Sequence, residues 1–326
     1  MMNYSEFKQG LMNAMQERYG FDYQIEEQKV KKANIGEVDA ISISRYDVGM
    51  LIYPDQMYKE YTTRHISIDD MITALDNQIP FIQVVAEDAP KIDLSREGIQ
   101  EGKAESRVYF KMIGIPGNEE FLKEIPYAKA EGFDDIALIP VVGVDVAGKY
   151  GTVIIKKDHI AAAGITAEEL HAAAFRNTDR LIMFHSLSDE IKGMIGEDVP
   201  FEFDSPLLIA RANSLFSSTS AAPIGAPSLL KQIYEQVGDH YVIPSSVNEI
   251  LILPKTSEID VSYLQSMIRD VNLTLRLEDR LSDSVFECKD GKYTTHSFSA
   301  AGAGAGDRIG SAMHDDPGLV NYGPTL

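Results

Sequence analysis

The residue types that could do chemistry gather in one short stretch, residues 238–254, with the sequence GDHYVIPSSVNEILILP. Ser245 and Ser246 could serve as hydroxyl nucleophiles, His240 as a general base, and Asp239 or Glu249 as the carboxylate that orients the histidine. A hydroxyl nucleophile needs a base within hydrogen-bonding reach, and the base needs a third group that fixes its tautomer. These residue types would suit a hydrolase.

The same stretch also has the pattern of a structural hairpin. Apolar runs at residues 241–243 and 250–253 flank the polar connector 244–249, which is typical of two strands joined by a turn. Serine and asparagine side chains in turns usually bond to nearby backbone groups. No Gly-x-Ser-x-Gly elbow is present to expose a nucleophilic serine. The turn interpretation is therefore favoured over the catalytic one.

No other stretch carries a recognisable cofactor or metal motif. The alternating glycines Gly302, Gly304 and Gly306 neither follow a strong strand nor open a periodic helix, so they do not indicate a dinucleotide site. The seven histidines form no His-x-x-x-His pair for a metal, and His185 is predicted to be a hydrogen-bonded, partly buried side chain. Cys288, the single cysteine, lies among carboxylates that disfavour a thiolate. We expect no cofactor and no metal.

Composition narrows the classes of partner. The chain has 326 residues, 44% of them hydrophobic, and 50 acidic against 30 basic residues give a formal charge of −20. A phosphate backbone would be repelled by this charge, which disfavours nucleic-acid binding. The N-terminus does not resemble an export signal, and no apolar run reaches the roughly 18 residues that a membrane span needs. Together with the lone cysteine, these features predict a cytoplasmic protein without membrane contact.

The periodicity predicts an α+β fold, with mainly antiparallel sheets covered by helices. The strongest strand signals are residues 136–144 and 151–155, and regular βαβ alternation is missing. Helical patterns include a first helix capped by Ser5 and short helices opened by Asn118 and by the Thr166 capping box. Two helices have a predicted buried stripe: Phe7, Leu11, Met12, Met15 and Tyr19 in the first, and Tyr263, Leu264, Met267, Ile268 and Val271 in a late helix capped by Asp260.

The sequence predicts two lobes and a tail. An N-terminal α+β lobe covers residues 1–186 and a C-terminal α+β lobe covers residues 206–293, and they meet near the Gly-rich, acidic segment 186–205. Residues 294–326 are dominated by Gly, Ala, Ser and Asp without a hydrophobic period. We predict that they form a disordered tail, because they cannot bury enough apolar surface to offset the entropy of ordering.

Five blocks, in order along the chain, resemble a bacterial domain-of-unknown-function family, number 5688, found mainly in gut anaerobes. They are residues 2–7 (MNYSEF), 118–126, 152–178 with the closing Asn177-Thr178, 241–254, and 281–286 (LSDSVF). The resemblance implies a cytoplasmic α+β protein and carries over no catalytic residue. Tyr127 stands where the family pattern would place a histidine, which argues against a shared catalytic histidine at that position.

The functional expectation follows from these observations. We expect a non-enzymatic cytoplasmic binding or regulatory protein with an unidentified protein or small-molecule partner. Its binding surface is predicted near the polar turn formed by Pro244, Ser245, Ser246 and Asn248, together with Asn177 and Thr178. The alternative is a hydrolase that uses Ser245 or Ser246 with His240.

Overall fold

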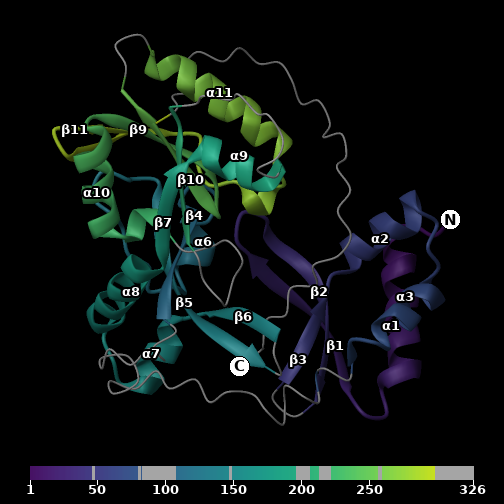
Figure 1. Ribbon diagram of the computed structural model, residues 1–326. Helices are drawn as coiled ribbons and strands as arrows, with labels where there is room; N and C mark the ends of the chain where they lie inside the picture. The colour runs from purple at the N-terminus through teal and green to yellow at the C-terminus, as the bar shows by residue number, and fades with distance from the viewer. Residues whose placement is uncertain are drawn as a thin grey trace. The chain divides into compact units, whose positions relative to one another are not determined.

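The computed structural model describes residues 1–45, 48–79, 82, 108–146, 149–195, 206–212, 222–255 and 259–297. The chain divides into two compact units. The first holds the described residues of Met1–Ile92 and Val144–Val153, and the second holds those of Asp93–Gly143 and Ile154–His314. Figure 1 shows the elements of each unit along the chain.

In the described part of the first unit, helices accompany a small antiparallel sheet. The helices are α1 (Tyr4–Tyr19), α2 (Pro54–Thr63) and α3 (Ile68–Leu75), and the sheet has the order β1 (Gln24–Lys32), β2 (Gly36–Arg45), β3 (Val48–Ile52). The predicted stripe of α1 is confirmed, because Phe7, Leu11, Met15 and Tyr19 are all buried. The predicted cap at Ser5 is wrong. Asn3 caps this helix, in a reciprocal box with Glu6.

Two further sheets follow later in the chain. One has the order β4 (Val108–Gly114), β5 (Ile136–Val146), β6 (Lys149–Ile154). The other has six strands in the order β12 (Lys292–His296), β11 (Val285–Lys289), β9 (His240–Ser246), β10 (Glu249–Pro254), β8 (Leu208–Ala212), β7 (Ile182–Ser186). All its neighbouring strands are antiparallel. The α+β prediction is therefore confirmed.

The helices of the second unit are α6 (Glu119–Leu122), α7 (Lys157–Ala163), α8 (Ala167–Leu181), α9 (Leu187–Ile195), α10 (Pro227–Val237) and α11 (Val261–Thr274), with single 3-10 turns η1 (Pro223–Gly225) and η2 (Leu277–Asp279). The Thr166 capping box opens α8 as predicted, and Gly238, at a φ of 68°, ends α10. Asn118 is the N-cap residue of α6, but its side chain makes no cap hydrogen bond, and its amide donates to the Gly114 carbonyl.

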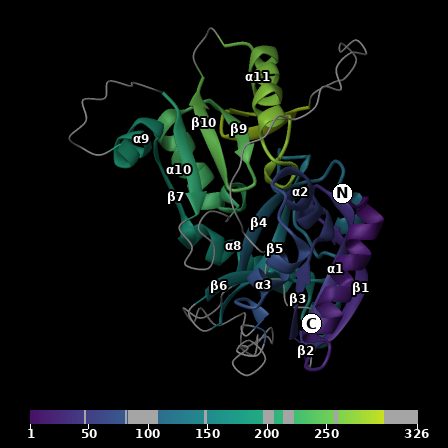
Figure 2. The same cartoon turned by 90° about the vertical axis from the view of Figure 1, so that its right-hand side faces the viewer.

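α11 lies along one side of the six-stranded sheet (Figures 1 and 2), and α10 lies on the other. Side chains alternate between the two faces of a strand, so Tyr241 and Ile243 of β9 point to the same side. They pack there with Leu253 of β10 and with Leu264 and Ile268 of α11. This cluster holds α11 against the sheet.

Two predicted boundaries differ from the structure. β7 ends at Ser186 and β8 begins at Leu208, and the two strands pair side by side, so the segment 186–205 connects neighbouring strands of one sheet. Residues 196–205 lie outside the described part of the chain. The predicted tail from residue 294 begins too early, because β12 pairs with β11 through His296. The rest of that tail, from residue 298, also lies outside the described residues.

Candidate functional site

His240 does not meet the serines that it would activate under the hydrolase alternative. It starts β9 while Ser245 and Ser246 end the same strand, and five extended residues span about 16 Å. The His240 side chain is fully buried and both ring nitrogens are bonded. Nδ1 donates to the Gly238 carbonyl at 2.7 Å, which leaves Nε2 to accept from the Tyr293 hydroxyl at 3.1 Å. This geometry contradicts the hydrolase alternative.

The serine hydroxyls are used by their own turn. Ser245 Oγ donates to the Glu249 carbonyl at 3.1 Å, and Ser246 Oγ accepts from the Asn248 backbone N–H at 3.1 Å. Pro244 is buried and the next four residues are half-buried. The turn therefore has the backbone-bonding role that the sequence favoured, and its hydroxyls stabilise the connection between β9 and β10.

Asn177 and Thr178 also bond to backbone groups. The Asn177 side-chain amide donates to the Val108 carbonyl at 2.8 Å, and the Phe110 N–H donates to Thr178 Oγ1 at 3.0 Å. The Phe110 carbonyl accepts from Ala222 N at 3.0 Å. β4 is an edge strand of its sheet, so these hydrogen bonds pair backbone groups that have no neighbouring strand on that side. Thr178 is fully buried, and the pair lies on α8 against β4, which belongs to a different sheet from the turn.

A cluster of charged side chains lies beside the turn. Glu249 is opposite Arg211 in the pairing of β10 with β8. Arg211 Nη2 lies 2.6 Å from one oxygen of Glu190 on α9, and His185 Nε2 lies 2.6 Å from the other. We call these four residues the charged cluster. Glu190 thus joins α9 to two neighbouring strands, β7 and β8.

The two carboxylates of the charged cluster have pKa values shifted in opposite directions, although burial favours the neutral form of both. Burial raises the pKa of Glu249, and the neighbouring Arg211 only partly offsets this effect. Burial also opposes ionisation of Glu190, but the bonds from His185 and Arg211 outweigh it and lower the pKa of that carboxyl. The predicted hydrogen-bonded state of His185 is confirmed. Arg211 and Glu190 carried no motif, and they come together because β8 pairs with β7 and α9 directly follows β7.

α11 presents side chains to solvent that the sequence assigned to the core. Tyr263, Met267 and Val271 are 67%, 38% and 46% exposed, whereas the helix buries Leu264, Ile268 and Asn272. The Asn272 amide donates to the Ser282 carbonyl at 3.0 Å and to Asp283 Oδ1 at 2.6 Å. These two bonds explain why the buried side is turned toward Asn272 and away from Tyr263.

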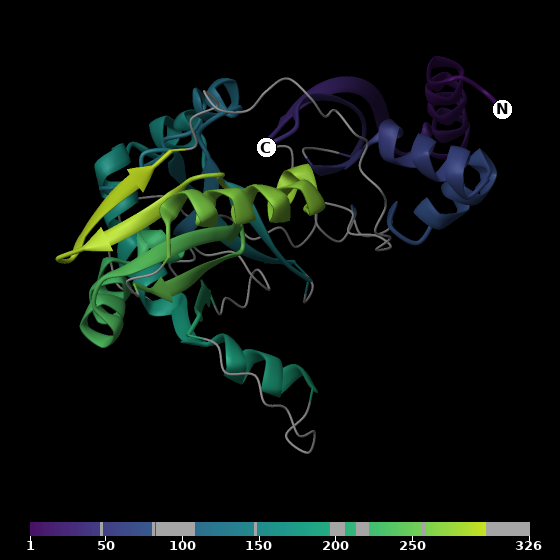
Figure 3. The same cartoon turned by 90° about the horizontal axis from the view of Figure 1, so that it is seen from above.

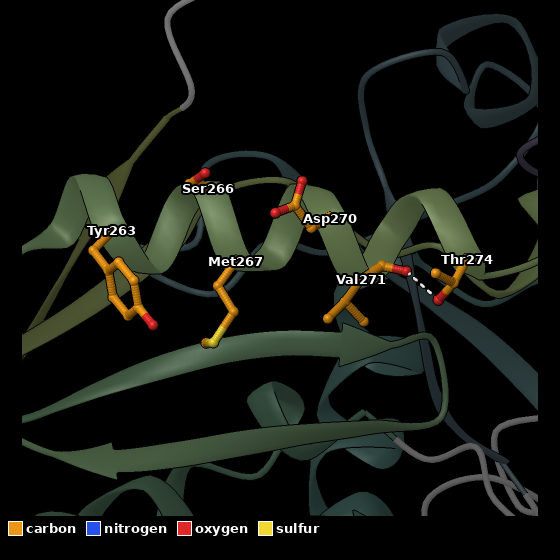
Figure 4. Close-up of a pocket in the computed structure, with 6 residues that line it drawn as sticks. All are labelled: Tyr263, Ser266, Met267, Asp270, Val271 and Thr274. Carbon is orange, nitrogen blue, oxygen red and sulfur yellow. Dashed lines mark hydrogen bonds between the residues drawn. The ribbon is translucent and has the colours of Figure 1, made fainter. Parts of the chain in front are cut away.

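The exposed side of α11 forms a groove of about 380 Å³. Its lining, which we call the α11 face, consists of Tyr263, Ser266, Met267, Asp270, Val271 and Thr274. Figure 4 shows the apolar side chains Tyr263, Met267 and Val271 pointing to one side of the helix, with Asp270 near the opposite edge. Seen from above, α11 is the yellow-green helix that lies alongside the sheet of its own unit (Figure 3).

The α11 face ends close to the polar turn. η2 follows α11 in the chain and carries Leu277, which is 53% exposed. The last residue of η2, Asp279, accepts a hydrogen bond through its carbonyl from Val247 N of the turn, at 3.0 Å. The predicted polar surface and the α11 face are therefore neighbours, with Leu277 in the segment that joins them.

Other chemistry-bearing residues stay inside the fold. Cys288 is fully buried, as predicted, and burial raises the pKa of its thiol. Within the described residues, no group of three or more His, Cys, Asp or Glu side chains is arranged to hold a metal ion. None of the helices in the described ranges combines the length and apolar character that crossing a bilayer requires.

Comparison with known proteins gives one match. The model of a family of unknown function, DUF5688, matches residues 4–289, which include all five blocks identified in the sequence from residue 4 onward. No curated protein and no solved structure matches the chain.

Proposed function

We propose that this chain, which belongs to the family of unknown function DUF5688, is a non-enzymatic binding or regulatory protein of the cytoplasm whose α11 face contacts a partner protein. The observation that supports the proposal most strongly is the exposure of Tyr263, Met267 and Val271 on one side of a single helix. Because they follow one another at intervals of four residues, these side chains form a continuous stripe.

Exposed apolar residues scattered singly are normal on protein surfaces, but a contiguous groove of them marks an interaction site more often. Tyrosine and methionine are also enriched at the centres of protein interfaces. A partner that covers this stripe would remove apolar area from water, which is the main favourable term in association. Asp270, Ser266 and Thr274 supply the polar groups that would fix its orientation.

In this proposal the polar turn forms the rim of the binding surface beside the α11 face. Its hydroxyls are bonded within the turn, so we assign Pro244, Ser245, Ser246 and Asn248 the role of holding the end of the surface in place. The bond from Val247 N to the Asp279 carbonyl links the turn to the segment that carries Leu277. Asn177 and Thr178 bond to β4 and are not included in the proposed surface.

The proposal is tested by affinity capture from an extract of the source cells, using the full chain as bait. Met267→Glu places a charge in the middle of the α11 face and should abolish capture of specific partners. Leu273→Glu is the matched control, because Leu273 is 64% exposed on the same helix but does not line the groove. Each captured protein is then tagged and used as bait in turn.

Loss of a partner with Met267→Glu, with retention in Leu273→Glu and reciprocal capture of the wild-type chain, is the expected result. Equal stability of the two variants in urea unfolding should accompany it, because both changes are made at exposed positions. If the Met267→Glu chain captured every partner of the wild type, the α11 face would not be the binding surface.

A further inference from the structure

We infer that the partner presents a basic amphipathic helix, which lies along α11 with its apolar side chains between Tyr263, Met267 and Val271 and a Lys or Arg opposite Asp270. This inference rests on the proposed function and specifies the chemistry of its partner. It follows from the shape of the α11 face, from its single charge and from the charge of the whole chain.

The shape of the α11 face suits a helix. Its lining residues run from Tyr263 to Thr274 along one side of α11, at spacings of three and four residues. Rows with this spacing form the ridges and grooves that a second helix fits when it packs at a small crossing angle. Twelve residues of helix extend about 18 Å, so a partner of about three turns would cover the face. Recognition through apolar residues at i, i+4 and i+7 is a common way to bind such a groove.

The negative charge of the α11 face favours a basic partner. Asp270 is the only charged residue among the six that line the groove. The chain as a whole carries a formal charge of −20, so its field also favours the approach of a cationic partner. A Lys or Arg opposite Asp270 would fix the register of the helix, while the apolar contacts supply most of the affinity.

The same charge argues against other occupants. A second copy of the chain would add another Asp270 and another 20 net negative charges, with no cation in either lining. Nucleic acids and anionic membranes would be repelled for the same reason. The chain's own C-terminal segment, residues 298–326, contains one basic residue, Arg308, against the three acids Asp307, Asp315 and Asp316. It therefore lacks the required charge.

The test uses two synthetic helical peptides of about 14 residues, with identical leucines at i, i+4 and i+7 and either lysine or glutamate at the flanking positions. Binding to the full chain is measured by calorimetry near physiological ionic strength. The basic peptide should bind at least about tenfold more tightly than the acidic one. Met267→Glu should weaken its binding by about tenfold or more, since it disrupts the apolar stripe.

Asp270→Lys tests whether the peptide contacts Asp270 itself or is attracted only by the net negative charge of the chain. It should weaken binding of the basic peptide by about fivefold and strengthen that of the acidic peptide. Glu235→Lys is the matched control, because it makes the same change in net charge on α10, at an exposed position on the other side of the sheet. Its effect on either peptide should stay below about twofold.

Three results would overturn the inference. The first is equal weakening by Asp270→Lys and Glu235→Lys, which would mean that only net charge attracts the peptide. The second is a wild-type dimer in sedimentation that Met267→Glu dissociates, because the occupant would then be a second copy. The third is binding of neither peptide while Met267→Glu still loses a captured partner, in which case the partner chemistry is wrong and the proposed surface stands. If the peptides behave as expected but capture is unchanged, the proposed function fails instead.

Discussion

The polar turn and the α11 face lie next to each other, yet their side chains are used in opposite ways. The turn contains the residue types of catalysis, but Ser245 and Ser246 bond to backbone groups of the turn itself. The α11 face contains ordinary core residue types, but Tyr263, Met267 and Val271 remain in contact with solvent. The residue type therefore determines which contacts a side chain can make. Its surroundings in the fold determine whether those contacts are already made within the protein.

The largest expected difference lies between the two sides of α11. Ile268 is 3% exposed and packs with the sheet, so Ile268→Ala should lower the free energy of unfolding by about 2–5 kcal/mol. Met267, one position earlier, does not belong to this cluster. Met267→Ala should therefore change the free energy of unfolding by about 0.5 kcal/mol or less. Urea unfolding of the two variants measures both values. A similar loss for Met267→Ala would mean that the α11 face is covered within the chain and is not free for a partner.

His240 should affect stability and have no direct effect on binding. His240→Phe keeps an aromatic ring, slightly larger than the imidazole, but leaves the Gly238 carbonyl and the Tyr293 hydroxyl without their partner, which should cost about 1–3 kcal/mol. Partner capture should be retained wherever the variant is folded. If the wild type had a hydrolytic activity that this variant lost at a pH where the variant is folded, His240 would be catalytic.

The pH dependence of stability gives a second measurement on His240. Burial lowers its pKa in the folded state, so the unfolded chain binds the proton more readily. The wild type should hold its full stability above the unfolded pKa of about 6.5 and lose stability as the pH falls below that value. The loss should stop once the pH is below the folded pKa. In His240→Phe this component should be missing, so the difference between the two chains should shrink as the pH falls.

Thr178 tests the bonds at the outer side of β4. Thr178→Val removes the oxygen that accepts from the Phe110 N–H and leaves a buried donor unpaired, which should cost about 1–3 kcal/mol. Thr178→Ser keeps the hydroxyl and is the matched control, with a smaller loss from the missing methyl group. Equal destabilisation by the two changes would show that packing at Thr178 matters more than the hydrogen bond.

Local signals in the sequence were sufficient where both partners lie a few residues apart. The buried stripe of α1, the Thr166 capping box and the Gly238 helix end all depend on such short-range patterns, and all are confirmed. The side-chain cap predicted at Asn118 does not form, although the Gly114 carbonyl that its amide contacts is only four residues away. A short separation therefore did not by itself identify the partner.

Long-range pairing explains what the sequence could not predict. Glu190, Arg211 and Glu249 come from three separate elements, and the register of β8 with β10 aligns two of them. In α11, the helical period correctly gave an apolar side, but it could not give the direction in which the Asn272 amide turns the helix. The orientation of a helix is decided by contacts with residues outside the helix, here Ser282 and Asp283. A stripe of apolar residues therefore predicts a contact without saying whether the contact lies inside the molecule.

Substitution of the two serines of the polar turn tests which of the two neighbouring regions contacts the partner. Ser245→Ala and Ser246→Ala each remove one hydrogen bond of a half-buried turn, so each should cost about 1 kcal/mol in urea unfolding. Since the hydroxyls serve the turn, the double variant should still capture the partners that Met267→Glu loses. If the double variant lost those partners while remaining within about 2 kcal/mol of the wild type, the polar turn would contact the partner directly. The α11 face would then be only part of a larger surface that includes Ser245 and Ser246.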